Sequence, residues 1–210
     1  MTKKSKTFLK LIPSFILFGV FLLSSETAFA RQTCTEVLYS GNTSKLSVGG
    51  KTYTISSSPS VRGWSYKGGR IASYVIFNGR ESVVIVEEFS PEEGFGEKLY
   101  TVKISNSDSI LGWDWDENTN IASYILYDGN KTVVKVEDFS GRKFNGVYST
   151  TTLSKSRIDK QNSSWTLNNG IAEYTLPQQL KSERFSNGTF GPVLETRNYN
   201  TRGIAGRSCY

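Results

Sequence analysis

The sequence predicts an all-β protein built from repeated four-stranded units. A tetrapeptide of the form Ile-Ala-Ser/Glu-Tyr recurs at residues 71–74, 121–124 and 171–174, an interval of fifty residues. Short runs rich in β-branched and aromatic residues are bounded by Gly, Asn, Asp and Ser, and no sustained helical period is present. We therefore expect little helix, with three copies of the unit and a shorter tail filling the mature chain.

Residues 1–30 have the features of a signal peptide. Four lysines precede an apolar run at 11–23, and residues 28–30 (Ala-Phe-Ala) have the small-x-small form that signal peptidase cuts. A membrane anchor is the alternative, but the run is short for a membrane span. The mature chain would be secreted or periplasmic and free of the membrane after cleavage.

The net charge of the chain gives no indication of nucleic-acid binding. Its formal value is +6, and four of the positive charges lie in the predicted signal peptide. No run of Lys and Arg interleaved with aromatic residues could follow a phosphate backbone. We expect no nucleic-acid partner.

Each repeat begins with a strand that carries tryptophan. The tetrapeptide follows six to eight residues later as the second strand. The tryptophans of the three copies are Trp64, then Trp113 and Trp115, then Trp165.

A hairpin and two further strands complete the unit. Asn78-Gly79 and Asp128-Gly129 mark the hairpin tips, because these dipeptides accept positive φ. The third strand ends in an acidic pair followed by Phe-Ser. Third strands are expected at 83–86 and 133–136, and fourth strands at 100–104 and 147–151, with 51–55 in the same place in the first copy.

The chain has two cysteines, Cys34 and Cys209, which lie near the two ends of the mature protein. In an oxidising compartment we expect them to form a disulfide that brings the termini together. Closing so long a loop would stabilise the fold by roughly 5 kcal/mol in the chain-entropy model.

Two phenylalanines and a glycine follow the third strand at a fixed spacing. In Phe139-x4-Phe144-x-Gly146 the polar segment is too short for an ordinary loop, so we expect it to fold back over its own sheet and to pack both rings on one core. Gly146 would supply a backbone conformation that a side chain would obstruct. The corresponding residues in the flanking copies are Phe89, Phe95 and Gly96, then Phe185 and Phe190.

This motif, followed by Trp, Asn/Asp and an Ile-x-Ser-like strand, resembles the Greek-key motif of the βγ-crystallin superfamily in a divergent, secreted bacterial form. The resemblance implies two-sheet sandwiches, with motifs 1 and 2 in residues 31–128, and motif 3 and a truncated motif 4 in residues 129–210. One alternative is the β-trefoil, which also uses three four-stranded repeats. Another is a propeller, although three blades are fewer than normally close a ring.

The family resemblance also implies a degenerate calcium site. Calcium prefers oxygen ligands, and the candidate residues are Asn118, Asn120 and Ser123 in one copy and Asn168 and Asn169 in another. The position that supplies a hydroxyl ligand in the family motif is alanine in all three copies. We expect weak or lost calcium binding and no other cofactor.

No catalytic residue is predicted, and the chain is expected not to be an enzyme. Histidine is absent, which excludes Ser-His-Asp and Cys-His systems and the usual zinc ligand sets. Two carboxylate pairs, Asp114 with Asp116 and Glu87 with Glu137, could act as a glycosidase acid and base. Their positions within or at the end of strands favour a structural role.

The function implied by the resemblance is a secreted, non-enzymatic structural or stress-protective protein. A binding module for an extracellular protein, as in a protease inhibitor, or for a polysaccharide is the first alternative. A carboxylate-dependent glycoside hydrolase is the second.

Overall fold

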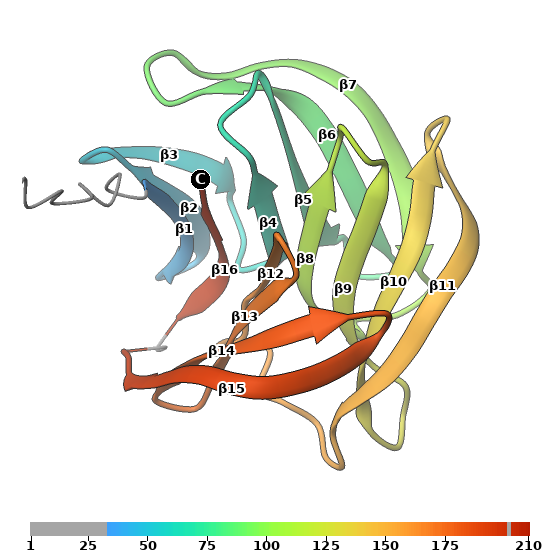
Figure 1. Ribbon diagram of the computed structural model, residues 1–210. Helices are drawn as coiled ribbons and strands as arrows, with labels where there is room; N and C mark the ends of the chain where they lie inside the picture. Colours follow the sequence, from blue (N-terminus) through green and yellow to red (C-terminus); the bar gives the residue numbers. More distant parts are fainter. Residues whose placement is uncertain (1–32, 201–202) are drawn as a thin grey trace, which may run out of the picture. The chain divides into compact units, whose positions relative to one another are not determined.

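The computed structural model describes residues 33–200 and 203–210, and this part of the chain is all-β. Its strands form four antiparallel sheets of four strands each, arranged as the blades of a β-propeller (Figure 1). No helix in the described ranges has the length and hydropathy needed to cross a membrane. The predicted signal peptide, residues 1–30, lies outside the described residues.

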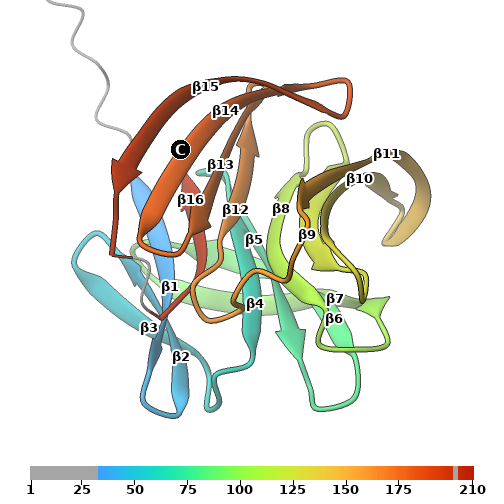
Figure 2. The ribbon, with the colours of Figure 1, turned by 90° about the horizontal axis from the view of Figure 1, so that it is seen from below.

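We name the sheets blades A to D, and in each the strands follow one another from the centre outward. Blade A is the exception, because its innermost strand comes from the C-terminal end of the chain. Figure 2 shows the same four blades from below. Blade A contains β16 (Ile204–Cys209), β1 (Cys34–Ser40), β2 (Thr43–Val48) and β3 (Lys51–Ser56); blade B contains β4 (Val61–Tyr66), β5 (Ile71–Phe77), β6 (Ser82–Ser90) and β7 (Gly94–Ser105); blade C contains β8 (Ile110–Asp116), β9 (Ile121–Tyr127), β10 (Thr132–Ser140) and β11 (Lys143–Ser154); blade D contains β12 (Trp165–Asn168), β13 (Ile171–Leu176), β14 (Gln179–Ser186) and β15 (Thr189–Asn198).

The Greek-key sandwich is therefore wrong, and so is the β-trefoil. A Greek key needs a strand that returns by a long connection to lie beside the first, whereas blades B, C and D are meanders of consecutive strands. The predicted domain boundary at residue 128 falls in the turn between β9 and β10, inside blade C. Only three repeats are visible in the sequence because the fourth blade is assembled from both ends of the described chain.

The predicted disulfide between Cys34 and Cys209 is confirmed, and it closes blade A. The two residues face each other where β1 pairs with β16. Thr33 and Tyr210 extend the pairing through two backbone hydrogen bonds of 3.0 Å. A disulfide at this place is compatible with a secreted or periplasmic location.

Three of the four junctions between blades are filled by a tryptophan of the innermost strand. Each indole is fully buried, and its Nε1 donates a hydrogen bond to a hydroxyl on the second strand of the preceding blade. Burying the large ring with its N–H satisfied gives each junction an apolar core without an orphaned donor. The pairs are Trp64 with Thr35 at 2.8 Å, Trp113 with Ser73 at 2.9 Å and Trp165 with Ser123 at 2.8 Å.

Glycines let the innermost strands approach one another around the centre. A Cβ placed on Gly63 would lie 2.4 Å from the backbone nitrogen of Trp113, and one on Gly206 would lie 2.7 Å from that of Trp64. Gly112 stands in the same relation to Trp165, with a Cβ distance of 2.7 Å. Any side chain at these positions would separate neighbouring blades.

The aromatic pair that suggested a crystallin motif belongs instead to the hairpin between the third and fourth strands. Phe139 and Phe144 face each other across β10 and β11 with ring centroids 4.7 Å apart, and both contact Trp113. The expectation that they share one core is confirmed. Gly146 is different, because its φ is not positive and a Cβ there would meet nothing within 4 Å.

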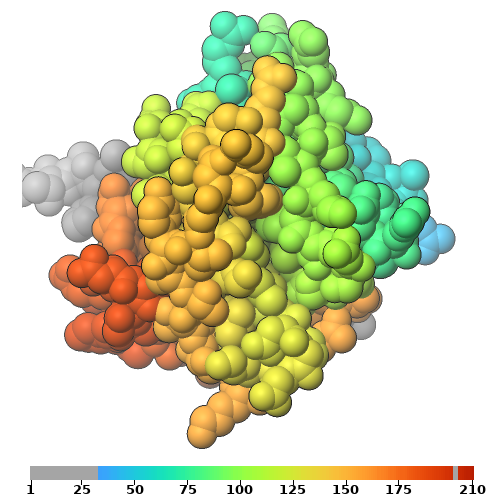
Figure 3. Space-filling view, turned by 90° about the vertical axis from the view of Figure 1, so that its right-hand side faces the viewer, coloured from blue at the N-terminus to red at the C-terminus, as the bar shows by residue number. Residues whose placement is uncertain are grey.

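The outer strands of blades B and C lie at the surface seen in Figure 3. Strand β11 is largely exposed along its length, including Val147 and Tyr148. It marks the outer edge of the ring in this region.

Candidate functional site

The junction between blades D and A has a different chemistry from the other three. On β16, Arg207 follows Gly206 and occupies the position that tryptophan holds after Gly63 and Gly112. On β13, Glu173 occupies the position of the hydroxyl partner that is Ser73 or Ser123 elsewhere. A charged pair thus replaces the tryptophan–hydroxyl pair.

Arg207 lies between two carboxylates. Its Nη1 donates a hydrogen bond to Glu173, and its Nε donates to Glu36 Oε1 at 3.2 Å. Its Nη2 also donates to Cys34 Sγ at 3.2 Å, so the guanidinium contacts the disulfide. Only 11% of the Arg207 side chain is exposed. Burial lowers its pKa and Glu36 opposes this shift, so the group remains a cation.

Tyr199 covers this charged pair from the connection that follows β15. Its hydroxyl donates a hydrogen bond to Glu36. Burial, together with this bond to a carboxylate, raises the pKa of Tyr199 above its ordinary value. The tyrosine therefore remains a neutral donor.

Blade A leaves the outer part of this junction uncovered because its outer strands are short. β2 and β3 have six residues each, whereas β6 and β10 have nine and β7 and β11 have twelve. In the longer blades the turn after the third strand packs on the preceding blade, with Gly94 against Tyr53 and Gly188 against Ser149. The turn residues Gly49 and Gly50 of blade A have open space at the Cβ position, as does Gly141 in blade C, where the neighbouring Arg142 contacts Tyr100 of blade B instead.

A pocket with a volume of about 590 Å³ opens beside this junction. It is built by all four strands of blade D, with Cys209 contributed by blade A. Hydroxyl, amide, carboxylate and guanidinium groups line it together with two aliphatic side chains. The lining residues are Thr166, Asn168, Asn169, Ile171, Glu173, Ser182, Leu194, Glu195, Arg197 and Cys209.

Two of the charged groups in the pocket are only loosely engaged. Arg197 lies 3.7 Å from Glu195 and 3.7 Å from Glu173, and the side chains of Arg197 and Glu195 are 49% and 53% exposed. Glu173 also accepts a hydrogen bond of 3.2 Å from Ser182. Glu173 is thus held by several partners, while Glu195 and Arg197 face solvent.

Two other polar clusters hold the blades together. Asp114 on β8 accepts hydrogen bonds from Ser65 and Lys67 of blade B, both at 2.8 Å, and from the backbone nitrogen of Leu167 in blade D at 3.0 Å. Because Asp114 is buried and satisfied from both neighbouring blades, it acts as a structural bridge.

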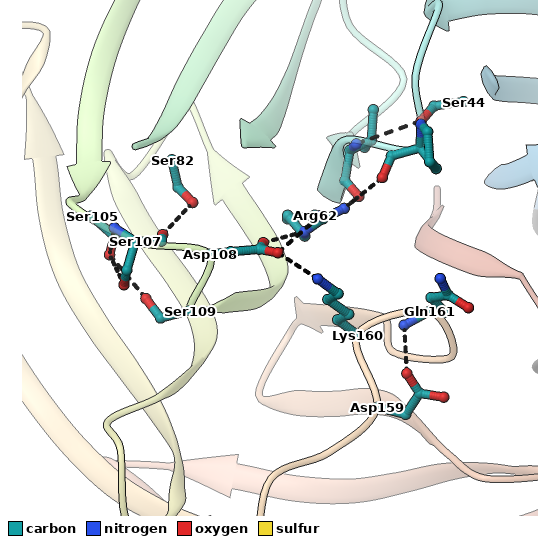
Figure 4. A network of polar contacts seen from close by, with 12 residues as sticks. Ser44, Arg62, Ser82, Ser105, Ser107, Asp108, Ser109, Asp159, Lys160 and Gln161 are labelled. Carbon is teal, nitrogen blue, oxygen red and sulfur yellow. Dashed lines mark hydrogen bonds and ion pairs between the residues drawn. The ribbon is translucent and has the colours of Figure 1, made fainter. Parts of the chain in front are cut away.

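Asp108 forms the second cluster, between blades (Figure 4). Arg62 donates to it through Nε and Nη2, and Lys160 donates through Nζ at 2.6 Å. Burial opposes ionisation of Asp108, but these two cations hold its pKa below the ordinary value. The figure also shows the Ser105, Ser107 and Ser109 hydroxyls bonded within the same connection.

The carboxylate pairs considered for glycoside hydrolysis are not brought together as exposed pairs. Glu87 accepts a hydrogen bond from Tyr74 at 2.8 Å in blade B, and Glu137 accepts one from Tyr124 at 2.7 Å in blade C. Burial raises the pKa of Glu87, and the Tyr74 bond opposes the shift. Both are internal contacts of their own blades.

The calcium candidates are distributed over several blade positions. Ser123 Oγ is buried and accepts the indole hydrogen bond of Trp165, so it is already used in the C–D junction. Asn118 and Asn120 lie in the turn between β8 and β9, whereas Asn168 and Asn169 line the D–A pocket. The described part of the chain holds no cluster of three acidic, cysteine or histidine side chains suited to a metal. Calcium binding stays a prediction.

Sequence reasoning missed four residues of this site: Glu173, Glu195, Arg197 and Arg207. The sequence does contain a signal for two of them. Glu173 replaces the serine of the Ile-Ala-Ser-Tyr tetrapeptide, and Arg207 follows Gly206 where tryptophan follows Gly63 and Gly112. The polysaccharide-binding alternative would need aromatic rings open to solvent, but Trp64 and Trp113 are inaccessible and Trp115 is nearly so.

No protein-family model and no curated protein matches the chain. Among solved structures it is similar to a periplasmic gluconolactonase from Pseudomonas aeruginosa, with a TM-score of 0.47 and 12% identity over 80% of this chain and 68% of that one. For TolB from Acinetobacter baumannii the TM-score is 0.46 and the identity 12%, over 76% of this chain and 40% of that one. For a chain of a nidogen/laminin complex the TM-score is 0.43 and the identity 4%, over 85% of this chain and 98% of that one.

These findings correct the family and function expected from the sequence. The βγ-crystallin resemblance is wrong because the sheets form a propeller. The structural or stress-protective role was inferred from that resemblance and is not supported either. The expectation that the chain is not an enzyme rested on the absence of histidine and on the strand positions of the carboxylates, and it is also corrected. TM-scores below 0.5 assign neither a family nor an activity to this chain.

Proposed function

We propose that the protein, in a secreted or periplasmic location, binds a small polar molecule in the pocket between blades D and A. The observation that carries the proposal is the break in the internal repeat. Three junctions bury a tryptophan against a hydroxyl group, and the fourth places Arg207 against Glu173 beside an open pocket.

The size and lining of the pocket support this function. A volume of about 590 Å³ lies within the range of small-molecule sites, which is about 300–1,000 Å³. Ile171 and Leu194 supply apolar surface, and the amides of Asn168 and Asn169 supply directional hydrogen-bonding groups. A few polar groups on a partly apolar wall are typical of ligand sites.

The energetics of the junction also favour a functional role. Replacing a buried ion pair by packed apolar side chains is often neutral or stabilising, so stability alone gives little reason for charge at this position. The chain solves the same packing problem with tryptophan three times. Charged groups that line a pocket are candidates for ligand recognition.

A plugged variant tests the proposal. Leu194→Trp places an indole at the pocket wall, where the native side chain is already half exposed, and Val147→Trp makes a comparable change on blade C outside the pocket. Thermal-shift screening of amino acids, organic acids, sugars and nucleosides, followed by calorimetric titration, compares both variants with the wild type.

We expect at least one class to raise the Tm of the wild type and of Val147→Trp and to leave Leu194→Trp unchanged. Equal binding to all three proteins would place the site elsewhere. Absence of binding to the wild type in every class would refute the proposed function.

A further inference from the structure

We propose that the ligand of the D–A pocket is a small zwitterion with an aliphatic side chain, of the α-amino acid class. This inference rests on the proposed function and specifies its ligand. Its basis is the arrangement of Glu195, Arg197, Ile171 and Leu194 in one cavity.

The charges available to a ligand are one anion and one cation. Glu195 and Arg197 stand two residues apart on β15, so their side chains project from the same face of the strand. Both line the pocket, and both are about half exposed. A ligand ammonium group can pair with Glu195 while its carboxylate accepts hydrogen bonds from the planar guanidinium of Arg197.

The other charged groups in this region are already engaged with one another. Arg207 is shared between Glu36 and Glu173, and Glu173 accepts a further hydrogen bond from Ser182. With Glu195 and Arg197 included, the junction carries three negative and two positive charges, so a dianion is disfavoured, and a dication would place one of its positive charges beside Arg197. A zwitterion has one positive and one negative group, which match Glu195 and Arg197.

Two large aliphatic side chains of the same pocket are exposed to water. Ile171 is 40% exposed and Leu194 is 47% exposed, and both line the same pocket. A hydrocarbon side chain on the ligand would cover them, whereas a polyol would leave them hydrated. The pocket thus offers three recognition points, which are ammonium, carboxylate and aliphatic chain.

Two amides in the pocket are also available to a ligand. Within the described residues the side chains of Asn168 and Asn169 make no hydrogen bond, and both line the pocket. Asn169 has a left-handed backbone with φ of 49°, which fixes the turn that presents it. The strand register places these amides at the Ile171 end of the pocket, away from Arg197, where they are further polar groups beside the aliphatic wall.

Calorimetric titration of the whole mature chain with L-leucine tests this assignment. Two truncated analogues separate its parts: 3-methylbutylamine lacks the carboxylate, and 4-methylpentanoate lacks the ammonium group. We expect L-leucine to bind at least tenfold more tightly than either analogue. Equal affinities for the three compounds would overturn the inference.

Charge-neutral variants then connect each group to its partner. We expect Arg197→Gln to weaken L-leucine at least tenfold and to leave 3-methylbutylamine unaffected, and Glu195→Gln to weaken L-leucine while sparing 4-methylpentanoate. Arg184→Gln, an exposed change on the same blade and outside the pocket, is the matched control and should bind as the wild type does.

The result separates this inference from the proposed function. If L-leucine fails to bind while another class binds the wild type and not Leu194→Trp, the zwitterion assignment is wrong and the pocket stands. If no class binds, both are wrong.

Discussion

Arg207 is the residue at which the internal repeat changes its chemistry. Its guanidinium joins Glu36 of its own blade to Glu173 of the preceding blade, where other blades pack an indole. A planar group with five donors can serve two carboxylates at once, which a lysine cannot do with the same geometry. The three charges are therefore mutually dependent.

Removing Arg207 alone should destabilise the protein. We expect Arg207→Met to lower the free energy of unfolding by about 3 kcal/mol, because Glu36 and Glu173 would be left without their cation. The triple variant Glu36→Leu, Arg207→Met, Glu173→Leu should recover most of this loss, since no unpaired charge remains. Urea unfolding monitored by tryptophan fluorescence measures both. A triple variant as unstable as the single one would show that the ion pairs themselves stabilise the ring.

At the scale of elements, the innermost strands are held at short distances by glycine. Gly63, Gly112 and Gly206 occupy the same position in β4, β8 and β16, and each faces the tryptophan segment of the next blade. A side chain here would contact backbone, which cannot move aside without displacing a whole strand. The close approach of the strands thus requires glycine at these positions. The three strands also contain few β-branched residues.

Two glycine substitutions test this view. Gly63→Ala should lower the free energy of unfolding by about 3 kcal/mol, since its Cβ would lie 2.4 Å from the Trp113 nitrogen. Gly146→Ala should be neutral or should stabilise by about 0.5 kcal/mol, because its site is open and its φ is not positive. Chemical denaturation of the two variants gives the comparison. A large loss for Gly146→Ala would restore the special role that the sequence motif assigned to it.

Strands within a repeat could be predicted from the sequence because their signals are local. β-branched runs and the Asn78-Gly79 and Asp128-Gly129 tips locate the hairpins of β5–β6 and β9–β10 correctly. β16 has no such run, and its partner β1 lies about 170 residues away in the sequence. β16 is a strand because it pairs with β1, and a pattern of neighbouring residues cannot show a pairing between the two ends of the chain.

For the whole molecule, the sequence predicted the covalent link between the ends but not the ring that it closes. Three visible copies suggested three units, because the fourth blade combines β16 with β1–β3 and so contains no continuous repeat. The pocket was missed for the same reason. Glu173 and Arg207 come together only when blade D meets the composite blade A.

Loss of the disulfide should weaken this closure. We expect Cys34→Ser with Cys209→Ser to lower the free energy of unfolding by about 5 kcal/mol in the chain-entropy model, since the bond closes a loop with a sequence separation of 175. The measurement is urea denaturation of the variant and of the oxidised wild type. A loss below about 1 kcal/mol would mean that strand pairing alone secures blade A.

The composite blade has a consequence for biosynthesis. A ribosome releases β1 to β3 long before β16, so the inner edge of blade A has no partner while blades B, C and D are being made. The edge of β1 that later pairs with β16 stays exposed to non-native contacts until that strand has been translated. Closure of this propeller must therefore wait for the synthesis of the six residues of β16.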